Sequence, residues 1–236
     1  MITHLHNFGC SYAHGALTDK NTSTAKILCK KNDLTFVDHS SNGFNNEGIL
    51  RRLQNYILKD NKNSIVLIMW SSPIRREYIY KKDNEYSWCK YKEKPAPTSD
   101  VIDKLTTFIK KTYKEKKDRF YLSFPGREKL PVSFFEQLLF RTYQQVLFAQ
   151  SLLKSHNIPY IMTWGFENIT VDDGPPDIKN AETLIDKKYF PAWNTSLDTI
   201  AKELNNYGTD RKHPGDECHN RLANLLDPTL KSMLLL

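Results

Sequence analysis

The sequence predicts an α/β protein, a three-layer α/β/α sandwich with a mostly parallel sheet. Residues 64–70 (SIVLIMW) form an apolar run too short for a typical helix, which fits a strand buried on both faces. Segments with strand and helix patterns alternate along the chain, as in doubly wound folds. The 236 residues, 39% of them hydrophobic, suffice for a sizeable core, and we expect one domain over 1–236.

The N-terminal part carries three of the expected strands. In the segment that follows the second strand, Ile49, Leu53 and Ile57 recur at helical spacing. Right-handed crossovers would place the carboxyl ends of the strands at one edge, where open α/β sheets bind ligands. The expected elements are strands over 2–8, 35–39 and 64–70, and helices over 16–31 and 49–58.

The remaining chain adds one strand and several helices, together with two insertions. Pro131 and Pro214 can each open a helix, because proline fits the first helical turn. Asp227-Pro228 is expected to end the last helix. The expected elements are a strand over 159–165, helices over 100–117, 131–156, 195–206 and 214–228, and insertions over about 71–100 and 166–194.

Composition limits the classes of partner. The net charge is +7, but the lysines are spread along the chain, and the cluster at 110–117 is typical of a solvated helix face. We therefore expect no nucleic-acid partner. No signal peptide and no apolar run of membrane-spanning length is visible, so a cytoplasmic or virion-associated protein is expected.

Neither a cofactor nor a metal ion is expected. The four cysteines show no CxxC spacing, which favours free thiols. His4 and His6 share one face of a strand, as metal ligands can, but they lack a third partner.

The stretch at 7–15 (NFGCSYAHG) contains the candidate nucleophile. Its small residues between a strand and a helix predict a sharp turn that presents Ser11 at the positive end of the helix. A serine needs a base to take its proton. The neighbouring Cys10 is expected to point into the core, because side chains alternate along a strand.

The segment at 210–223 contains the candidate base. Asp210 precedes His213 by three residues, so its carboxylate can accept a hydrogen bond from one ring nitrogen and leave the other for a serine. Pro214 keeps His213 out of the helix. A second pair, Asp216 and His219, has the same spacing but falls inside the expected helix.

Together these two segments resemble the SGNH hydrolases, also called GDSL esterases. Gly9-Cys10-Ser11 is similar to the Gly-Asp-Ser block of that family. Asp210 to Ala223 is similar to its Asp-x-x-His-Pro block, with Cys218 at a position where the family has glycine. The resemblance implies a flavodoxin-like architecture and a triad of Ser11, His213 and Asp210, and it selects this pair over Asp216 and His219.

The resemblance also implies an oxyanion hole. Gly43 lies where the family's second block offers a backbone N–H. The third block departs from the family, because residues 70–77 (WSSPIRRE) lack its asparagine. The expected third donor is Asn46, beside Gly43; the alternatives are Asn45, Ser71 or Ser72, or an incomplete hole.

Two classes of function remain open. The first is an ester hydrolase for a small-molecule or glycan ester, with O-acetylated carbohydrate as one candidate. Ser71 and Arg75 are candidate substrate contacts, although ordinary ion pairs are the favoured role of Arg75 and Arg76. The second class is a non-catalytic binding or structural protein that keeps the fold, for example a component of a virion. The sequence does not indicate the oligomeric state.

Overall fold

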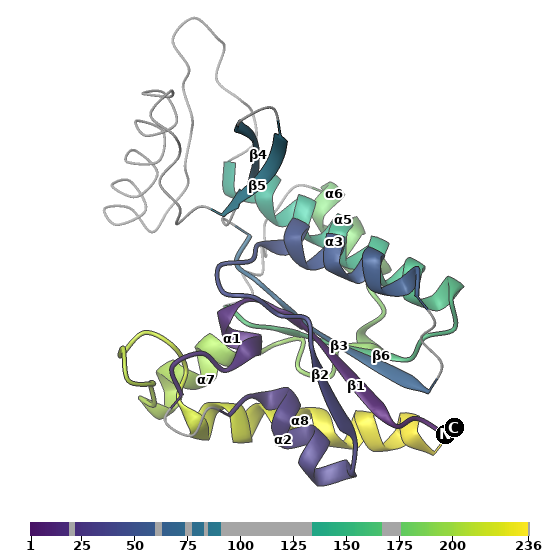
Figure 1. The fold of residues 1–236 in the computed structure, drawn as a ribbon, viewed down its shortest axis with the longest axis vertical. Coiled ribbons are helices and arrows are strands. Elements are labelled where there is room, and N and C mark those ends of the chain that lie inside the picture. Colours follow the sequence, from purple (N-terminus) through teal and green to yellow (C-terminus); the bar gives the residue numbers. More distant parts are fainter. Residues whose placement is uncertain are drawn as a thin grey trace, which may run out of the picture.

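A four-stranded, all-parallel sheet lies between two layers of helices (Figure 1), which confirms the predicted α/β class. The strand order is β2-β1-β3-β6. The strands are β1 (His4–Gly9), β2 (Thr35–Asp38), β3 (Ser64–Trp70) and β6 (Tyr160–Trp164). The computed structural model describes residues 1–18, 22–59, 63–73, 77–82, 85–90, 134–166 and 176–235.

The register of the sheet brings the functional segments to one edge. Gly9 at the end of β1 pairs with Met69 of β3, and Asn7 pairs with Asp38 at the end of β2. Every residue of β3 and β6 is buried, as expected for strands covered on both faces. The residues that follow β1, β2 and β3 therefore meet at the carboxyl edge of the sheet.

Helices cover both faces of the sheet (Figure 1). One layer holds α3 (Asn46–Ile57), α5 (Phe134–Ser155) and α6 (Pro176–Leu184). The other holds α2 (Thr24–Asn32), α7 (Leu197–Leu204) and α8 (Asp216–Leu234), with the short α1 (Ser11–His14) at the carboxyl edge. None of the described helices has both the length and the apolar sequence that crossing a membrane requires.

The helix predicted over 16–31 begins later than expected. The chain forms the one-turn helix α1, ends it at Gly15 in the left-handed conformation (φ 71°), and begins α2 only at Thr24, where Ser23 caps the helix. A Cβ atom at Gly15 would lie 1.9 Å from the Thr22 carbonyl oxygen. The chain therefore doubles back on itself between α1 and α2 instead of continuing one helix.

The C-terminal helix is longer than predicted. It passes through Pro228 and ends at Leu234. Leu226, Leu230 and Met233 are buried at helical spacing on both sides of the proline. Packing of this apolar face outweighs the local cost of proline within a helix.

Both insertions contain regular structure that the sequence pattern does not indicate. The first contains the antiparallel pair β4 (Glu77–Lys82) and β5 (Glu85–Lys90), and the second contains α6 and the 3₁₀ helix η1 (Lys187–Tyr189). The predicted helix over 100–117 with its lysine cluster, and the residues Arg75 and Arg76, lie outside the described residues.

Candidate active site

Ser11 stands at the sharp turn between β1 and α1. Cys10 occupies the N-cap position and is fully buried, so its thiol points away from solvent as predicted. A Cβ atom at Gly9 would lie 2.3 Å from the Ala13 Cβ and 2.9 Å from the Met69 carbonyl oxygen. The close approach of β3 and α1 therefore requires glycine directly before the turn.

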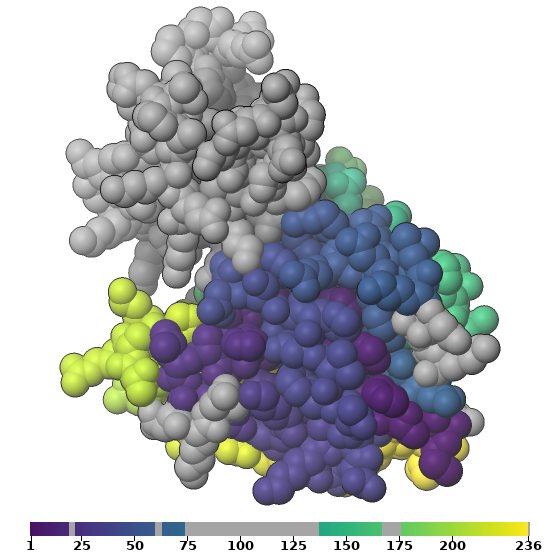
Figure 2. Space-filling model, viewed as in Figure 1, coloured from purple at the N-terminus to yellow at the C-terminus, as the bar shows by residue number. Residues whose placement is uncertain are grey.

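The loop that carries the candidate base is docked on the N-terminal segment. It is closed by the Gly208 N–H, which donates to the His213 carbonyl oxygen at 2.7 Å. The Thr209 N–H donates to the Leu17 carbonyl oxygen at 3.0 Å. In Figure 2 the yellow-green segment near residue 210 lies against the purple N-terminal segment. The loop reaches the residues that follow Ser11, although the two segments are distant in sequence.

The three predicted triad side chains are in contact. The His213 Nε2 atom lies 3.0 Å from the Ser11 Oγ atom, and the His213 Nδ1 atom lies 2.7 Å from the Asp210 Oδ2 atom. The other carboxylate oxygen of Asp210 accepts the backbone N–H groups of Lys212 and His213, each at 2.9 Å. The ring of His213 is thus held between a carboxylate and a hydroxyl.

The Asp210 carboxyl group is stabilised as an anion. The backbone N–H of His213, with further help from the His213 ring and the Lys212 N–H, holds the pKa of this carboxyl well below its usual range. An ionised Asp210 accepts the Nδ1 proton of the ring. The Nε2 lone pair then faces the Ser11 hydroxyl, which is the orientation that a general base requires.

Tyr12 is a site residue that the sequence pattern does not indicate. Its ring stacks on Phe166 at a centroid distance of 4.2 Å and meets the His213 ring edge-on at 5.5 Å. Its hydroxyl donates to the Lys212 carbonyl oxygen at 3.4 Å. Tyr12 therefore supports the loop around His213. In the sequence, only its position directly after Ser11 could have indicated that Tyr12 belongs to the site. Neither the periodicity nor the motif gives the direction of its side chain.

The two backbone N–H groups expected in the oxyanion hole are those of Ser11 and Gly43. Ser11 is the first residue of α1, so its N–H has no partner within the helix. Gly43, at φ 78°, belongs to a turn in which the Phe44 N–H donates to the Ser41 carbonyl oxygen. The Ser41 N–H in turn donates to the Gly9 carbonyl oxygen at 3.1 Å. The Gly43 turn is therefore anchored to the end of β1, close to Ser11.

The structure gives Asn46 and Asn45 roles other than oxyanion binding. The Asn46 Oδ1 atom accepts the Ser71 N–H at 2.7 Å, and its Nδ2 donates to the Ser71 carbonyl oxygen at 3.1 Å. Asn45 caps α3 by accepting the Gly48 N–H at 2.8 Å. We expected Asn46 as the third donor, but its amide fixes the chain after β3 instead. The Ser71 hydroxyl is buried and has no hydrogen-bond partner among the described residues.

The other candidates are not part of this cluster. His219 is buried between α8 and α2 and accepts the Thr24 N–H at 3.2 Å, so it is not paired with Asp216. Cys218 is buried, and its thiol donates to the Asn206 carbonyl oxygen. Among the described residues, no group of three or more histidine, cysteine or acidic side chains could hold a metal ion.

No protein-family model matches the sequence, and no curated protein matches it. Solved structures do match the fold. TesA is 13% identical, with a TM-score of 0.51, covering 98% of this chain and 99% of its own. The psychrotrophic esterase EstA from Pseudoalteromonas sp. is 14% identical, with a TM-score of 0.50 over the whole of both chains. The chain has the SGNH hydrolase fold. In this SGNH hydrolase fold, Ser11 follows the first strand and His213 precedes the last helix.

Proposed function

We propose that this protein is a serine ester hydrolase. The observation that carries the proposal is the connected series from the Ser11 Oγ through the two ring nitrogens of His213 to the Asp210 carboxylate, at 3.0 and 2.7 Å. The same three residues lie where the resemblance of the sequence to the SGNH hydrolases places a triad. No cofactor is needed for this chemistry.

The reaction proceeds in two acyl transfers. The Ser11 Oγ attacks the ester carbonyl carbon while its proton moves to the His213 Nε2, and Asp210 stabilises the resulting imidazolium. Collapse of the tetrahedral intermediate breaks the bond to the alcohol oxygen, which receives the proton from His213. A water molecule then attacks the acyl-serine by the same route, which releases the acid and restores Ser11.

Three donors would stabilise the negative oxygen of the intermediate. Two are the backbone N–H groups of Ser11 and Gly43. The third is the Ser71 hydroxyl, which takes the place of the asparagine in the family's third block. Three facts support this choice: Ser71 follows the strand next to β1, Asn46 fixes its backbone, and its hydroxyl has no partner among the described residues. Loss of one such donor typically lowers the rate by ~100- to 1000-fold.

The test combines turnover with covalent labelling. Hydrolysis of nitrophenyl acetate and an O-acetylated sugar measures turnover, and a fluorophosphonate probe reports an activated serine. A phosphonate is an apt probe, because EstA is described as inhibited by monoethylphosphonate. Ser11→Ala should abolish labelling and lower turnover by several orders of magnitude. The matched control is Ser232→Ala, at an exposed serine of α8, which should leave both unchanged.

Equal turnover by the wild type and Ser11→Ala would remove Ser11 from the mechanism. A folded wild type that neither hydrolyses these esters nor reacts with the probe would contradict the proposal. That result would favour the second class of function, a binding or structural protein that keeps the hydrolase fold.

A further inference from the structure

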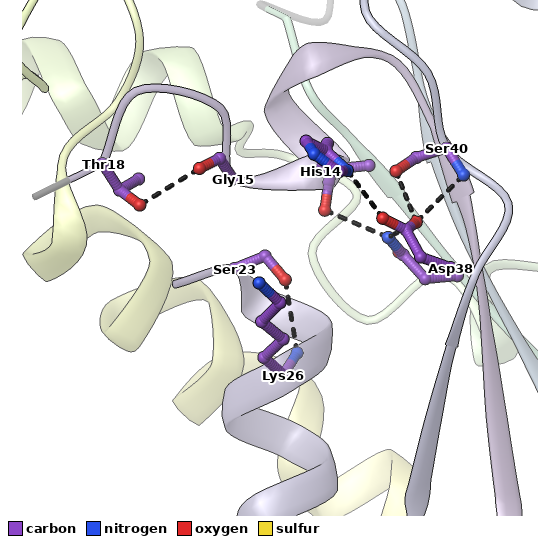
Figure 3. Close-up of polar contacts among 9 residues, drawn as sticks. His14, Gly15, Thr18, Ser23, Lys26, Asp38 and Ser40 are labelled. Carbon is purple, nitrogen blue, oxygen red and sulfur yellow. Dashed lines mark hydrogen bonds and ion pairs between the residues drawn. The ribbon is translucent and has the colours of Figure 1, made fainter. Parts of the chain in front are cut away.

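We infer that Asp38 is a positioning residue, which holds the nucleophile turn and the Gly43 turn in one geometry. This inference rests on the proposed function, because it concerns the two sources of oxyanion donors. Asp38 ends β2 at the carboxyl edge of the sheet, and its side chain is one-fifth exposed. Its carboxylate is surrounded by donors from three separate segments of the chain (Figure 3).

The first set of contacts reaches the nucleophile turn. The His14 Nδ1 atom, at the end of α1, lies 2.6 Å from the Asp38 Oδ2 atom. The Asn7 Nδ2 group donates to the Asp38 Oδ1 atom at 3.1 Å and also to the Ala13 carbonyl oxygen at 3.0 Å. His14 and Ala13 belong to the same helical turn as Ser11. Asp38 therefore restrains that turn directly through His14 and indirectly through Asn7.

The second set of contacts reaches the segment before Gly43. Both the backbone N–H and the hydroxyl of Ser40 donate to the Asp38 Oδ1 atom, the former at 2.9 Å. Figure 3 shows His14 and Ser40 on two sides of the same carboxylate. The next residue, Ser41, begins the turn that contains Gly43. One carboxylate thus connects the segment with the Ser11 N–H to the segment with the Gly43 N–H.

This connection matters because the two N–H groups must point at the same oxygen atom. Oxyanion donors act at distances of about 2.7–3.1 Å, so a small relative shift of the two turns weakens one of them. A displacement of about 1 Å can lower a rate by ~100-fold. The half-exposed His14–Asp38 ion pair contributes little to stability by itself. We therefore expect the carboxylate to affect the rate more than the overall stability.

Two substitutions at Asp38 separate positioning from packing. Asp38→Ala removes both carboxylate oxygens that contact Asn7, His14 and Ser40. We therefore expect kcat and the rate of fluorophosphonate labelling to fall about 10- to 100-fold, with KM within about twofold of wild type. Asp38→Asn keeps one oxygen that can accept from Asn7 and Ser40. It should recover most of the lost rate, within about fivefold of wild type.

Asp227 offers a matched control within the same chain. It is also a partly covered carboxylate that joins two elements, because it accepts from Asn32 of α2 at 2.8 Å and pairs with Lys231 at 2.9 Å. It lies about 16 Å along the α8 axis from Asp216, in the half of the helix remote from His213. Asp227→Ala should lower the melting temperature and leave kcat and the labelling rate unchanged.

Amide hydrogen exchange provides a readout that does not depend on activity. Asp38→Ala should speed exchange in both residues 11–16 and residues 40–44, whereas Asp227→Ala should not. A folded Asp38→Ala variant with wild-type labelling and wild-type exchange overturns the inference, and so does an Asp38→Asn variant as slow as Asp38→Ala. If the wild type is never labelled, the proposed function fails. Exchange then still decides whether Asp38 couples the two turns.

Discussion

His219 gives the chain a built-in sensitivity to acid. Its ring is 1% exposed between α8 and α2, and its Nδ1 atom accepts the Thr24 N–H at 3.2 Å. Burial lowers the pKa of His219 from 6.5 to about 4, because desolvation disfavours the charged ring. The folded state thus holds this ring neutral at a pH where the unfolded chain protonates it.

The sign and size of the effect follow from the two pKa values. Because the native pKa lies below the unfolded value, the unfolded chain binds more protons, and the free energy of unfolding falls as the pH drops from 6.5 towards 4. The full difference corresponds to ~3.4 kcal/mol. About 2 kcal/mol of it should be lost by about pH 5, and above about pH 7.5 almost none is lost.

The measurement compares wild type with His219→Gln, which has an oxygen to accept the Thr24 N–H but no titrating ring. Urea unfolding followed by tryptophan fluorescence gives the free energy of unfolding near pH 7.5 and near pH 5 for both proteins. The difference should be about 2 kcal/mol smaller in the variant. His6, whose pKa burial also lowers to about 4, contributes equally to both proteins and cancels. Parallel losses in the two proteins would refute the role of His219.

Three further predictions concern the site. Ser71→Ala should lower kcat by ~100-fold without a change in melting temperature, whereas the matched Ser72→Ala should leave kcat unchanged. Equal kcat values for the two variants would exclude the Ser71 hydroxyl as an oxyanion donor. Asp210→Asn should lower kcat by ~10⁴-fold, because an amide favours the wrong ring tautomer of the base; a tenfold loss or less would contradict that role. Gly9→Ala should yield little folded protein by circular dichroism, because its Cβ would collide with Ala13, and a wild-type melting temperature would be unexpected.

The parts of the site that the sequence indicates are those that local patterns encode. Ser11 stands in a short strand-to-helix motif, and Asp210 lies three residues before His213, so each half of the triad is visible in one segment. Their meeting is expected from the resemblance to the SGNH hydrolases, because His213 lies in the loop between α7 and α8 and follows none of the four strands of the sheet. The contacts at 3.0 and 2.7 Å agree with that expectation.

The parts that the sequence does not indicate depend on contacts between distant segments. Asn46 is 25 residues from Ser71, and no local pattern shows that its amide binds that backbone rather than a ligand. The direction of the Tyr12 ring depends on its stacking against Phe166, which follows β6 and is far from Tyr12 in the sequence. The ends of the helices also depend on contacts between segments. α1 ends at Gly15, where the chain packs back against Thr22. α8 continues through Pro228, because residues on both sides of the proline are buried.

The docking of the 208–213 loop on Leu17 has a consequence for biosynthesis. Ser11 and His213 are separated by 202 positions, so a growing chain carries its hydroxyl long before the imidazole has been translated. Under the proposed mechanism, a nascent chain cannot hydrolyse esters until His213 has been translated and α8 has packed beside α2. A chain cut between α7 and that loop should show the proposed activity when its two pieces are mixed and α8 packs again beside α2 and α7.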